Sequence, residues 1–307
     1  MITLLHSTNA YRSMERDVSP SSLIVFPDAK YLRALLKECA KAFFGKENER
    51  RNALIEEETF ADCIVLPAAG AKLSVDDAAR VVDESLLHPV EEDKKLFVLD
   101  AFDTASTLVQ NKLLKILEEP PAGVYFLLGA SGEGAVLPTV LSRVRKLNVP
   151  PFAEEAVLAA LNRNHAGEKE LARAAAASGG VYSLAEELVS GGENFRIAER
   201  LFEGKELEKL CREAGDIKDR GAFFAALRLT ARDMLFYRTG QERFASLKGE
   251  NLKRLAKTYP EGALLSAARF IGEAQREVEF NASMRQALYT LGLRIQEEKT
   301  KWQKLSQ

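Results

Sequence analysis

The sequence predicts an α/β domain built on a parallel sheet, followed by two helical domains. Three observations lead to this fold class. Short apolar runs alternate with helical patterns over the first half of the chain, strand signals vanish after a pair of prolines, and Ala, Leu, Glu and Lys dominate the remainder. Near-continuous apolar strands separated by helices are typical of a parallel sheet that is covered by helices on both faces.

The first domain is expected to hold five strands. They are SLIVF, ADCIVLP, KKLFVLD, GVYFLLGAS and RKLNVPP, and the helical patterns between them are YLRALLKECAKAFF, SVDDAARVVDESLLH, TLVQNKLLKILEE and LPTVLSRV. Proline cannot donate to a strand ladder, so Pro150 and Pro151 end the last strand. We therefore expect the α/β domain to cover residues 1–150.

The rest of the chain is expected to be helical. FAEEAVLAALNRN, EKELARAAAAS and GGVYSLAEELVS predict a compact three-helix domain over residues 151–195, which ends at the glycine-rich SGGENF. Residues 196–307 are expected to form a third, all-helical domain. Two apolar stripes at helical spacing indicate packing faces rather than cofactor sites: Phe223, Leu227, Thr230 and Met234, and Met284, Leu288, Leu291 and Ile295.

Composition is that of a soluble globular protein. Of the 307 residues 46% are apolar and 29% are charged, and the formal net charge of −2 provides no global attraction to nucleic acid. Any DNA contact must then depend on a local basic patch or on helix N-termini. No window reaches the roughly 18 apolar residues of a membrane span, and the N-terminus lacks a signal sequence, so we expect a cytoplasmic protein.

Cysteines and histidines are too scattered for a metal site. Cys39, Cys63 and Cys211 form no CxxC pair, and His6, His88 and His165 are equally isolated. The sequence therefore predicts neither a zinc site nor a disulfide framework.

One run carries most of the chemical information. LFVLDAFD is an apolar strand ending at Asp100, where an ATPase would hold Mg²⁺, and the next residue of such an enzyme is usually a glutamate that polarises water. Here that residue is Ala101. By itself an aspartate at the end of a strand more often simply begins a turn. Ser106 stands directly before TLVQNKLLKILEE, where its hydroxyl can cap the free N–H groups of a helix.

Together with the segments that follow, this run strongly resembles the clamp-loader branch of the AAA+ family. The family pattern is close to DE-A-x-x-h-(S/T)-x-x-A-x-N-A-L-L-K-x-L-E-E-P-P, then an apolar strand, then L-P-T-I-L-S-R-C. The step from Asp100 to Asn111, the LEEPP ending at Pro121 and LPTVLSR at residues 137–143 all fall where the family has them. The resemblance is strong over residues 20–150, diffuse in residues 151–195 and weak beyond, although EFNASMRQALYTLGLRI looks like the family's last collar helix. It implies an AAA+ domain, a three-helix lid and a helical collar.

The departures from that family lie in the nucleotide site. A working P-loop reads G-x-x-x-x-G-K-(S/T), which supplies backbone N–H groups and a lysine to the phosphates and a hydroxyl to Mg²⁺. FPDAKYLR contains no glycine, Leu32 stands at about the lysine position and Arg33 at about the hydroxyl position. Tyr182 replaces the family's lid arginine. With Ala101, these losses predict that the chain binds no ATP.

One catalytic element of the family is retained. In SRV, Ser142 and Arg143 match the family's Ser-Arg-Cys motif, whose arginine reaches the γ-phosphate held by a neighbouring subunit. The alternative is an ordinary surface arginine. The resemblance also implies that the helix start at Ser106 and Thr107 faces the DNA backbone, although both could be plain helix caps. The family's four-cysteine zinc module is missing, so no zinc is expected.

The resemblance implies a non-hydrolysing, stator-like subunit of a clamp loader. Such a subunit would assemble with gamma/tau-type ATPase subunits and a delta-type subunit, open the sliding clamp on primed DNA and complete a neighbour's ATP site through Arg143. Two alternatives stay open. The chain could be an active ATPase of the gamma or tau type, or a binding protein of the same fold that acts outside the replisome.

Overall fold

The computed structural model describes residues 1–165, 171–190, 192–217, 220–247 and 249–305. Internal contacts divide the chain into two units, Met1–Pro151 and Phe152–Gln307. The division falls one residue beyond the boundary that the proline pair predicts. The further boundary at residue 195, between a lid and a collar domain, stays a prediction.

The first unit is built on a five-stranded sheet, and all five strands expected from the sequence are present. They are β1 (Ser21–Val25), β2 (Cys63–Leu66), β3 (Lys95–Leu99), β4 (Val124–Ala130) and β5 (Arg145–Asn148). The order is β2-β3-β4-β1-β5 and every neighbouring pair is parallel. Because β1 has β4 on one side and β5 on the other, the strand order reverses beside it. In open parallel sheets, ligands bind at the carboxyl ends of the strands around such a reversal.

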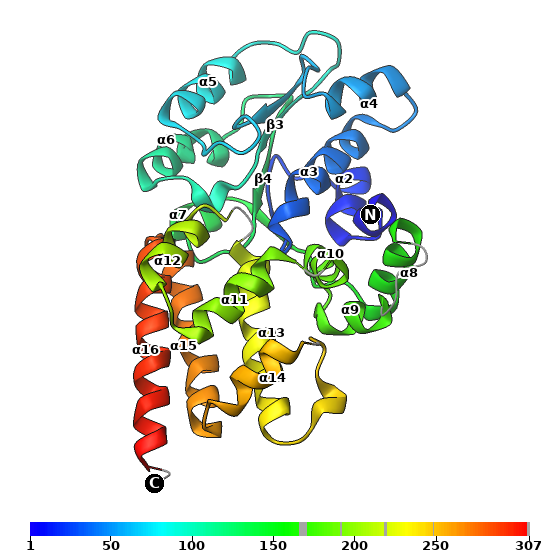
Figure 1. Cartoon of the computed structure of the whole chain (residues 1–307). Coiled ribbons are helices and arrows are strands. Elements are labelled where there is room, and N and C mark those ends of the chain that lie inside the picture. The colour runs from blue at the N-terminus through cyan, green and yellow to red at the C-terminus, as the bar shows by residue number, and fades with distance from the viewer. Residues whose placement is uncertain (166–170, 191, 218–219, 248, 306–307) are drawn as a thin grey trace. The chain divides into compact units, whose positions relative to one another are not determined.

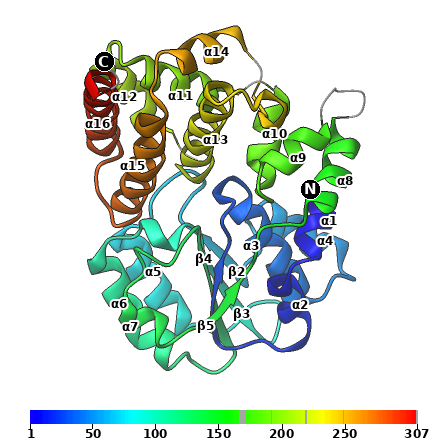
Figure 2. The same cartoon turned by 90° about the horizontal axis from the view of Figure 1, so that it is seen from below.

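Helices cover both faces of this sheet (Figures 1 and 2). One face carries α3 (Ala29–Phe44) and α4 (Glu49–Glu56), and the other carries α5 (Val75–Ser85) and α6 (Thr107–Glu118). A 3₁₀ turn, η1 (Phe102–Thr104), follows β3, and α7 (Pro138–Leu141) precedes β5. The α/β class predicted from the strand and helix alternation is therefore confirmed.

The N-terminal segment, for which the sequence provides no interpretation, forms two short helices. They are α1 (Ile2–His6) and α2 (Asn9–Arg16). The side chain of Thr8 caps α2 by accepting a hydrogen bond from the N–H of Tyr11, and Tyr11 itself is buried. Helix α2 packs against α3 and β5, so this segment completes the outer layer of the first unit.

The second unit is helical throughout its described residues. Its helices are α8 (Glu154–Asn164), α9 (Leu171–Ala177), α10 (Tyr182–Ser190), α11 (Glu193–Glu203), α12 (Leu207–Gly215), α13 (Arg220–Arg238), α14 (Glu250–Lys257), α15 (Glu261–Glu279) and α16 (Met284–Leu305), with a 3₁₀ turn η2 (Glu242–Phe244). Both apolar stripes predicted from spacing are buried, the first on α13 and the second on α16. They belong to one core, which α11, α12, α14 and α15 complete.

Candidate functional site

The connection between β1 and α3 has little room for a phosphate. It consists of Phe26, Pro27 and Asp28 only. Phe26 extends the ladder by donating its N–H to the carbonyl of Ala130 at 2.9 Å, and its ring is buried. A phosphate-binding loop instead keeps several backbone N–H groups pointed at the ligand, which needs glycine. In this chain the buried ring of Phe26 lies in the connection that would have to form such a loop.

Leu32, at the position expected for the phosphate-binding lysine, is a core residue. Its side chain is 2% exposed and packs against β4 at Gly129. A Cβ added to Gly129 would lie 3.2 Å from Leu32 Cδ1 and 2.6 Å from Leu36 Cδ1. Glycine at this position lets α3 approach the sheet closely. Leu32 therefore helps to pack α3 against the sheet. A lysine at this buried position would need a partner for its charge.

Arg33, at the position expected for the magnesium-binding hydroxyl, is held by three segments of its own unit. Its Nε and Nη2 donate to the two carboxylate oxygens of Glu58 at 2.7 and 2.5 Å. Nη1 donates to Asp100 Oδ2 at 3.0 Å, and Nη2 also donates to the carbonyl of Pro67 at 3.0 Å. The side chain is 16% exposed. The carboxylate expected to hold Mg²⁺ thus accepts a hydrogen bond from a guanidinium.

The charges in this cluster stabilise one another. Burial disfavours the charged form of Arg33, but its hydrogen bonds to Glu58 and Asp100 outweigh that effect and raise its pKa. The same bidentate contact with Arg33 lowers the pKa of Glu58 against the opposing effect of burial. A divalent cation at Asp100 would have to displace the guanidinium and lose these contacts. The residues present do not suit a magnesium nucleotide.

Backbone strain accompanies this cluster. Ala101 adopts the left-handed region with φ 48° and ψ 42°, and Glu58 has φ 60°. A non-glycine residue in this region costs about 1–2 kcal/mol. The turn at Ala101 leads into η1, where Asp103 Oδ2 accepts hydrogen bonds from the hydroxyl and the N–H of Ser131 at 2.6 and 3.2 Å. Burial raises the pKa of Asp103. The ends of β3 and β4 are thereby tied together.

Arg143 has a different environment. Its side chain is 31% exposed, Nε donates to Glu118 Oε2 at 2.6 Å, and Nη1 donates to the carbonyl of Thr139 at 3.0 Å and approaches Ser142 Oγ at 3.4 Å. Ser142 itself donates to the Thr139 carbonyl and ends α7. Within the part of the chain that the structure describes, Nη2 of Arg143 makes no hydrogen bond. Val144, which stands where the family has cysteine, is 9% exposed.

The remaining predicted residues have structural contacts. Ser106 caps α6 by accepting a hydrogen bond from the N–H of Val109 at 3.4 Å, and Thr107 begins the helix with an exposed side chain. Tyr182 begins α10 in the second unit, where its side chain is fully buried and its hydroxyl accepts a hydrogen bond from Asn164 at 2.6 Å. At the lid arginine position the chain therefore has a core residue that joins α10 to α8.

Comparisons with known proteins find similarity mainly in the first unit. A family model described as "DNA polymerase III, delta subunit" matches residues 12–153. The DNA polymerase III subunit gamma/tau of Mycobacterium bovis is 34% identical over 101 residues, which are 32% of this chain and 17% of that protein. The matched residues, just under half of this chain, are therefore similar to subunits of the DNA polymerase III clamp loader. The first unit, with the P-loop and Arg143 regions, contains almost all of the family match.

A second relative matches a segment of similar length, and one solved structure has a similar fold. Subunit tau of Salmonella typhimurium is 32% identical over 103 residues, which are 34% of this chain and 16% of that protein. A DNA polymerase III gamma subunit-related protein from Thermotoga maritima has a similar fold, with a TM-score of 0.50, 18% identity and coverage of 96% of this chain and 99% of that one. The matched segment spans only about a sixth of the length of these gamma/tau and tau relatives.

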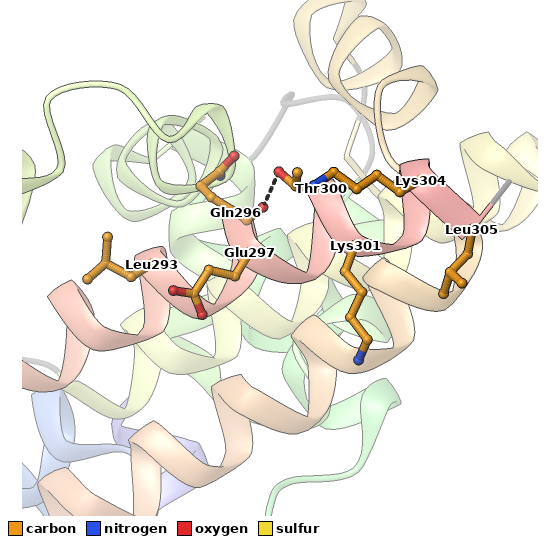
Figure 3. Close-up of a pocket in the computed structure, with 7 residues that line it drawn as sticks. All are labelled: Leu293, Gln296, Glu297, Thr300, Lys301, Lys304 and Leu305. Atoms are coloured by element: carbon orange, nitrogen blue, oxygen red, sulfur yellow. Dashed lines mark hydrogen bonds between the residues drawn. The ribbon is translucent and has the colours of Figure 1, made fainter. Parts of the chain in front are cut away.

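The second unit has a hollow in its surface beside α16, between Leu293 and Leu305 (Figure 3). All the lining residues belong to this one helix, and Thr300 donates its hydroxyl to the Gln296 carbonyl of the preceding turn. In the described parts of the chain no group of three or more His, Cys, Asp or Glu side chains could hold a metal ion, and no helix is long and apolar enough to cross a membrane. The three cysteines are buried free thiols, and burial raises the pKa of Cys63 to about 12.

Sequence reasoning missed Glu58 and Glu118, the carboxylates that hold the two arginines. Glu58 lies 25 residues after Arg33, and Glu118 lies 25 residues before Arg143. Neither pairing has a local sequence signal, since glutamates are frequent around both positions. Glu118 does lie within LEEPP, a part of the clamp-loader pattern, and this was the one sequence feature that pointed to it.

Proposed function

We propose that the chain is a non-hydrolysing, delta-prime-type subunit of the DNA polymerase III clamp loader. In this role it assembles in the cytoplasm with gamma/tau-type ATPase subunits and a delta-type subunit, and the assembly loads the sliding clamp on primed DNA. It is then part of a DNA polymerase holoenzyme without being an ATPase itself. The observation that carries the proposal is the ion pair of Arg33 with Asp100, 3.0 Å long.

That ion pair supports the loss of ATP binding for a physical reason. A magnesium nucleotide needs a carboxylate free to face the ion and positive charge aimed at the phosphates. Here Asp100 already faces Arg33, and Leu32 is packed in the core. Restoring a site would require three changes together: a glycine-containing loop, a lysine in place of Leu32 and a hydroxyl in place of Arg33.

Arg143 supports a role at a neighbour's site. It is partly exposed, its backbone N–H is fixed to the Val140 carbonyl at 2.9 Å, and Nη2 remains available in the described structure. A guanidinium supplied in trans meets the charge that develops on the transferred phosphoryl group. Ser142, at the end of α7, contacts the same guanidinium. We assign the finger role to Arg143 on these grounds.

The proposal also includes a contact between DNA and the start of α6 at Ser106 and Thr107. Ser106 satisfies a free N–H of the first turn of α6, and both side chains are exposed. The N-terminal end of a 12-residue helix attracts anions, including a DNA phosphate. We include it because the exposed end of α6 leaves its other N–H groups open to a ligand.

A second candidate is an active ATPase of the gamma/tau type. The relatives with 31–34% identity are themselves tau or gamma/tau subunits, which favours this reading. Nucleotide binding separates the two candidates. A gamma/tau-type chain must bind Mg-ATP by itself, whereas a delta-prime-type chain needs only to complete the site of another subunit.

Isothermal calorimetry of the purified chain with Mg-ATP tests the proposal. We expect no heat of binding, with a gamma/tau-type subunit as the positive control in the same buffer. Micromolar binding would replace the proposal with the ATPase reading. A pull-down from the source cytoplasm tests the assembly: recovery of other clamp-loader subunits supports it, and recovery of none would favour a protein that acts outside the replisome.

A further inference from the structure

Glu118 gives the arginine finger region a feature that the proposed function does not yet explain. It is the last residue of α6, and its carboxylate accepts from Nε of Arg143 at 2.6 Å. Helices α6 and α7 lie side by side in the first unit (Figure 1). The contact therefore crosses from one helix end to the turn that carries Arg143.

Stability is a poor explanation for this ion pair. The Glu118 side chain is 54% exposed and that of Arg143 is 31% exposed. Exposed ion pairs contribute little to folding because water screens the attraction and two long side chains lose rotamer freedom. What the pair does supply is an orientation for the guanidinium.

That orientation is specific. Glu118 engages Nε, the nitrogen nearest the chain, and the Thr139 carbonyl engages Nη1 at 3.0 Å. Two points of attachment fix the plane of a guanidinium, because its donors form a rigid fork. Nη2 makes no hydrogen bond to any part of the chain that the structure describes. One of its N–H groups lies on the same side as Nε and Glu118, and the other, on the side away from Glu118, is left to donate to an acceptor outside the chain.

We propose that Glu118 is a positioning residue that holds Arg143 with its Nη2 edge turned outward to a phosphate oxygen of a neighbouring subunit's nucleotide. The inference rests on the proposed function, since it needs Arg143 to act in trans. A long arginine side chain loses much rotamer freedom when it is fixed. Fixing it before the neighbour's nucleotide arrives removes that loss from the transition state. Glu118 touches no reacting atom and acts only through Arg143.

The experiment is steady-state ATP hydrolysis by the assembled clamp loader with primed DNA and clamp. We expect Glu118→Ala to lower kcat about tenfold with little change in KM, a loss equivalent to about 1.4 kcal/mol in the barrier. Glu118→Gln, which still accepts a hydrogen bond, should recover part of the rate. Glu119→Ala is the matched control, because it removes the same charge one residue away and Glu119 has no contact with Arg143 among those the structure gives.

A double mutant tests whether Glu118 affects the rate through Arg143. If Glu118 acts through Arg143, then Glu118→Ala causes no further loss in an Arg143→Ala background. An equal loss in that background, or an unchanged or faster rate for Glu118→Ala alone, would overturn the inference. Size-exclusion chromatography checks assembly, and Glu118→Gln serves if the alanine variant fails to assemble. No effect of Arg143→Ala itself would instead remove the finger role, so the two failures are distinguishable.

Discussion

Arg33 and Arg143 carry the same guanidinium in the same unit, but they use it in opposite ways. Arg33 is 16% exposed, and all three of its nitrogens donate to its own chain. Arg143 is 31% exposed, and its outer nitrogen has no acceptor within the described structure. An arginine whose three nitrogens all donate within its own chain acts as a link in the fold. One with an open edge can serve another molecule.

Removal of the open-edged arginine should have the largest effect. We expect Arg143→Ala to leave assembly intact and to lower the DNA-stimulated ATPase rate of the complex at least tenfold, because a guanidinium in trans is worth about 10³ to 10⁵ in rate. Arg145→Ala is the control, since Arg145 lies two residues away and pairs with Asp17 on the surface. An unchanged ATPase rate in the Arg143 variant would make this residue an ordinary surface arginine.

Leu32→Lys should show that restoring the lysine alone does not rebuild a nucleotide site. The lysine would lie in the core against Gly129 without a partner, so we expect the first unit to lose about 3 kcal/mol of stability. We also expect it to gain no ATP binding. Hydrogen exchange of peptides from β1 and β4 measures the stability, and the volume-conserving Leu32→Met is the control, at a cost under about 1.5 kcal/mol. Micromolar ATP binding by the lysine variant would contradict the account of this loop.

Arg33→Met should lower the stability of the first unit without affecting assembly. It leaves Asp100 and Glu58 without the cation between them, and we expect a loss of about 2 kcal/mol, less than for a fully buried pair because both carboxylates are partly exposed. Adding Glu58→Gln should recover part of the loss, since it removes one of the stranded charges. Hydrogen exchange in α3 and β3 gives the measurement. A variant as stable as the original chain would mean that Arg33 is not a link in the fold.

The sequence predicted the frame of the first unit better than the contacts within it. Apolar runs bounded by Gly and Pro marked all five strands, and their alternation with helices implied a parallel sheet, because both signals are local. The residues Leu32, Arg33 and Ala101 predict a nucleotide site that has lost its phosphate- and magnesium-binding groups, and this stays a prediction. What took its place was not predictable, since the partner of Arg33 depends on a distant turn at Glu58 with a left-handed backbone. Tyr182 appeared only as a missing arginine, and its burial comes from packing against α8.

At acid pH, the free energies of unfolding of the original chain and of Arg33→Met should differ less than at neutral pH. Because Arg33 lowers the folded-state pKa of Glu58, the stabilisation is complete above the unfolded value of 4.5 and is lost as pH falls through the folded pKa. Urea unfolding followed by far-ultraviolet circular dichroism at about pH 7 and about pH 3.5 measures this. Arg80→Met, which removes an exposed pair with Glu84, should have little effect at either pH. A stability difference that is as large in acid as at neutral pH would exclude Glu58 as the main partner.

Ala101→Gly should have the smallest effect, and it should stabilise. Ala101 has φ 48°, where a Cβ costs about 1–2 kcal/mol, while glycine loses about 0.5–1 kcal/mol more entropy on folding, so the net gain is about 0.5 kcal/mol. Ala105→Gly is the matched control four residues on, because Ala105 has φ −70° and is buried, and there the same change should destabilise. Urea unfolding of the two variants side by side compares the signs. Equal losses in both would mean that the turn after β3 carries no strain, and that the residue in place of the water-activating glutamate adopts its conformation freely.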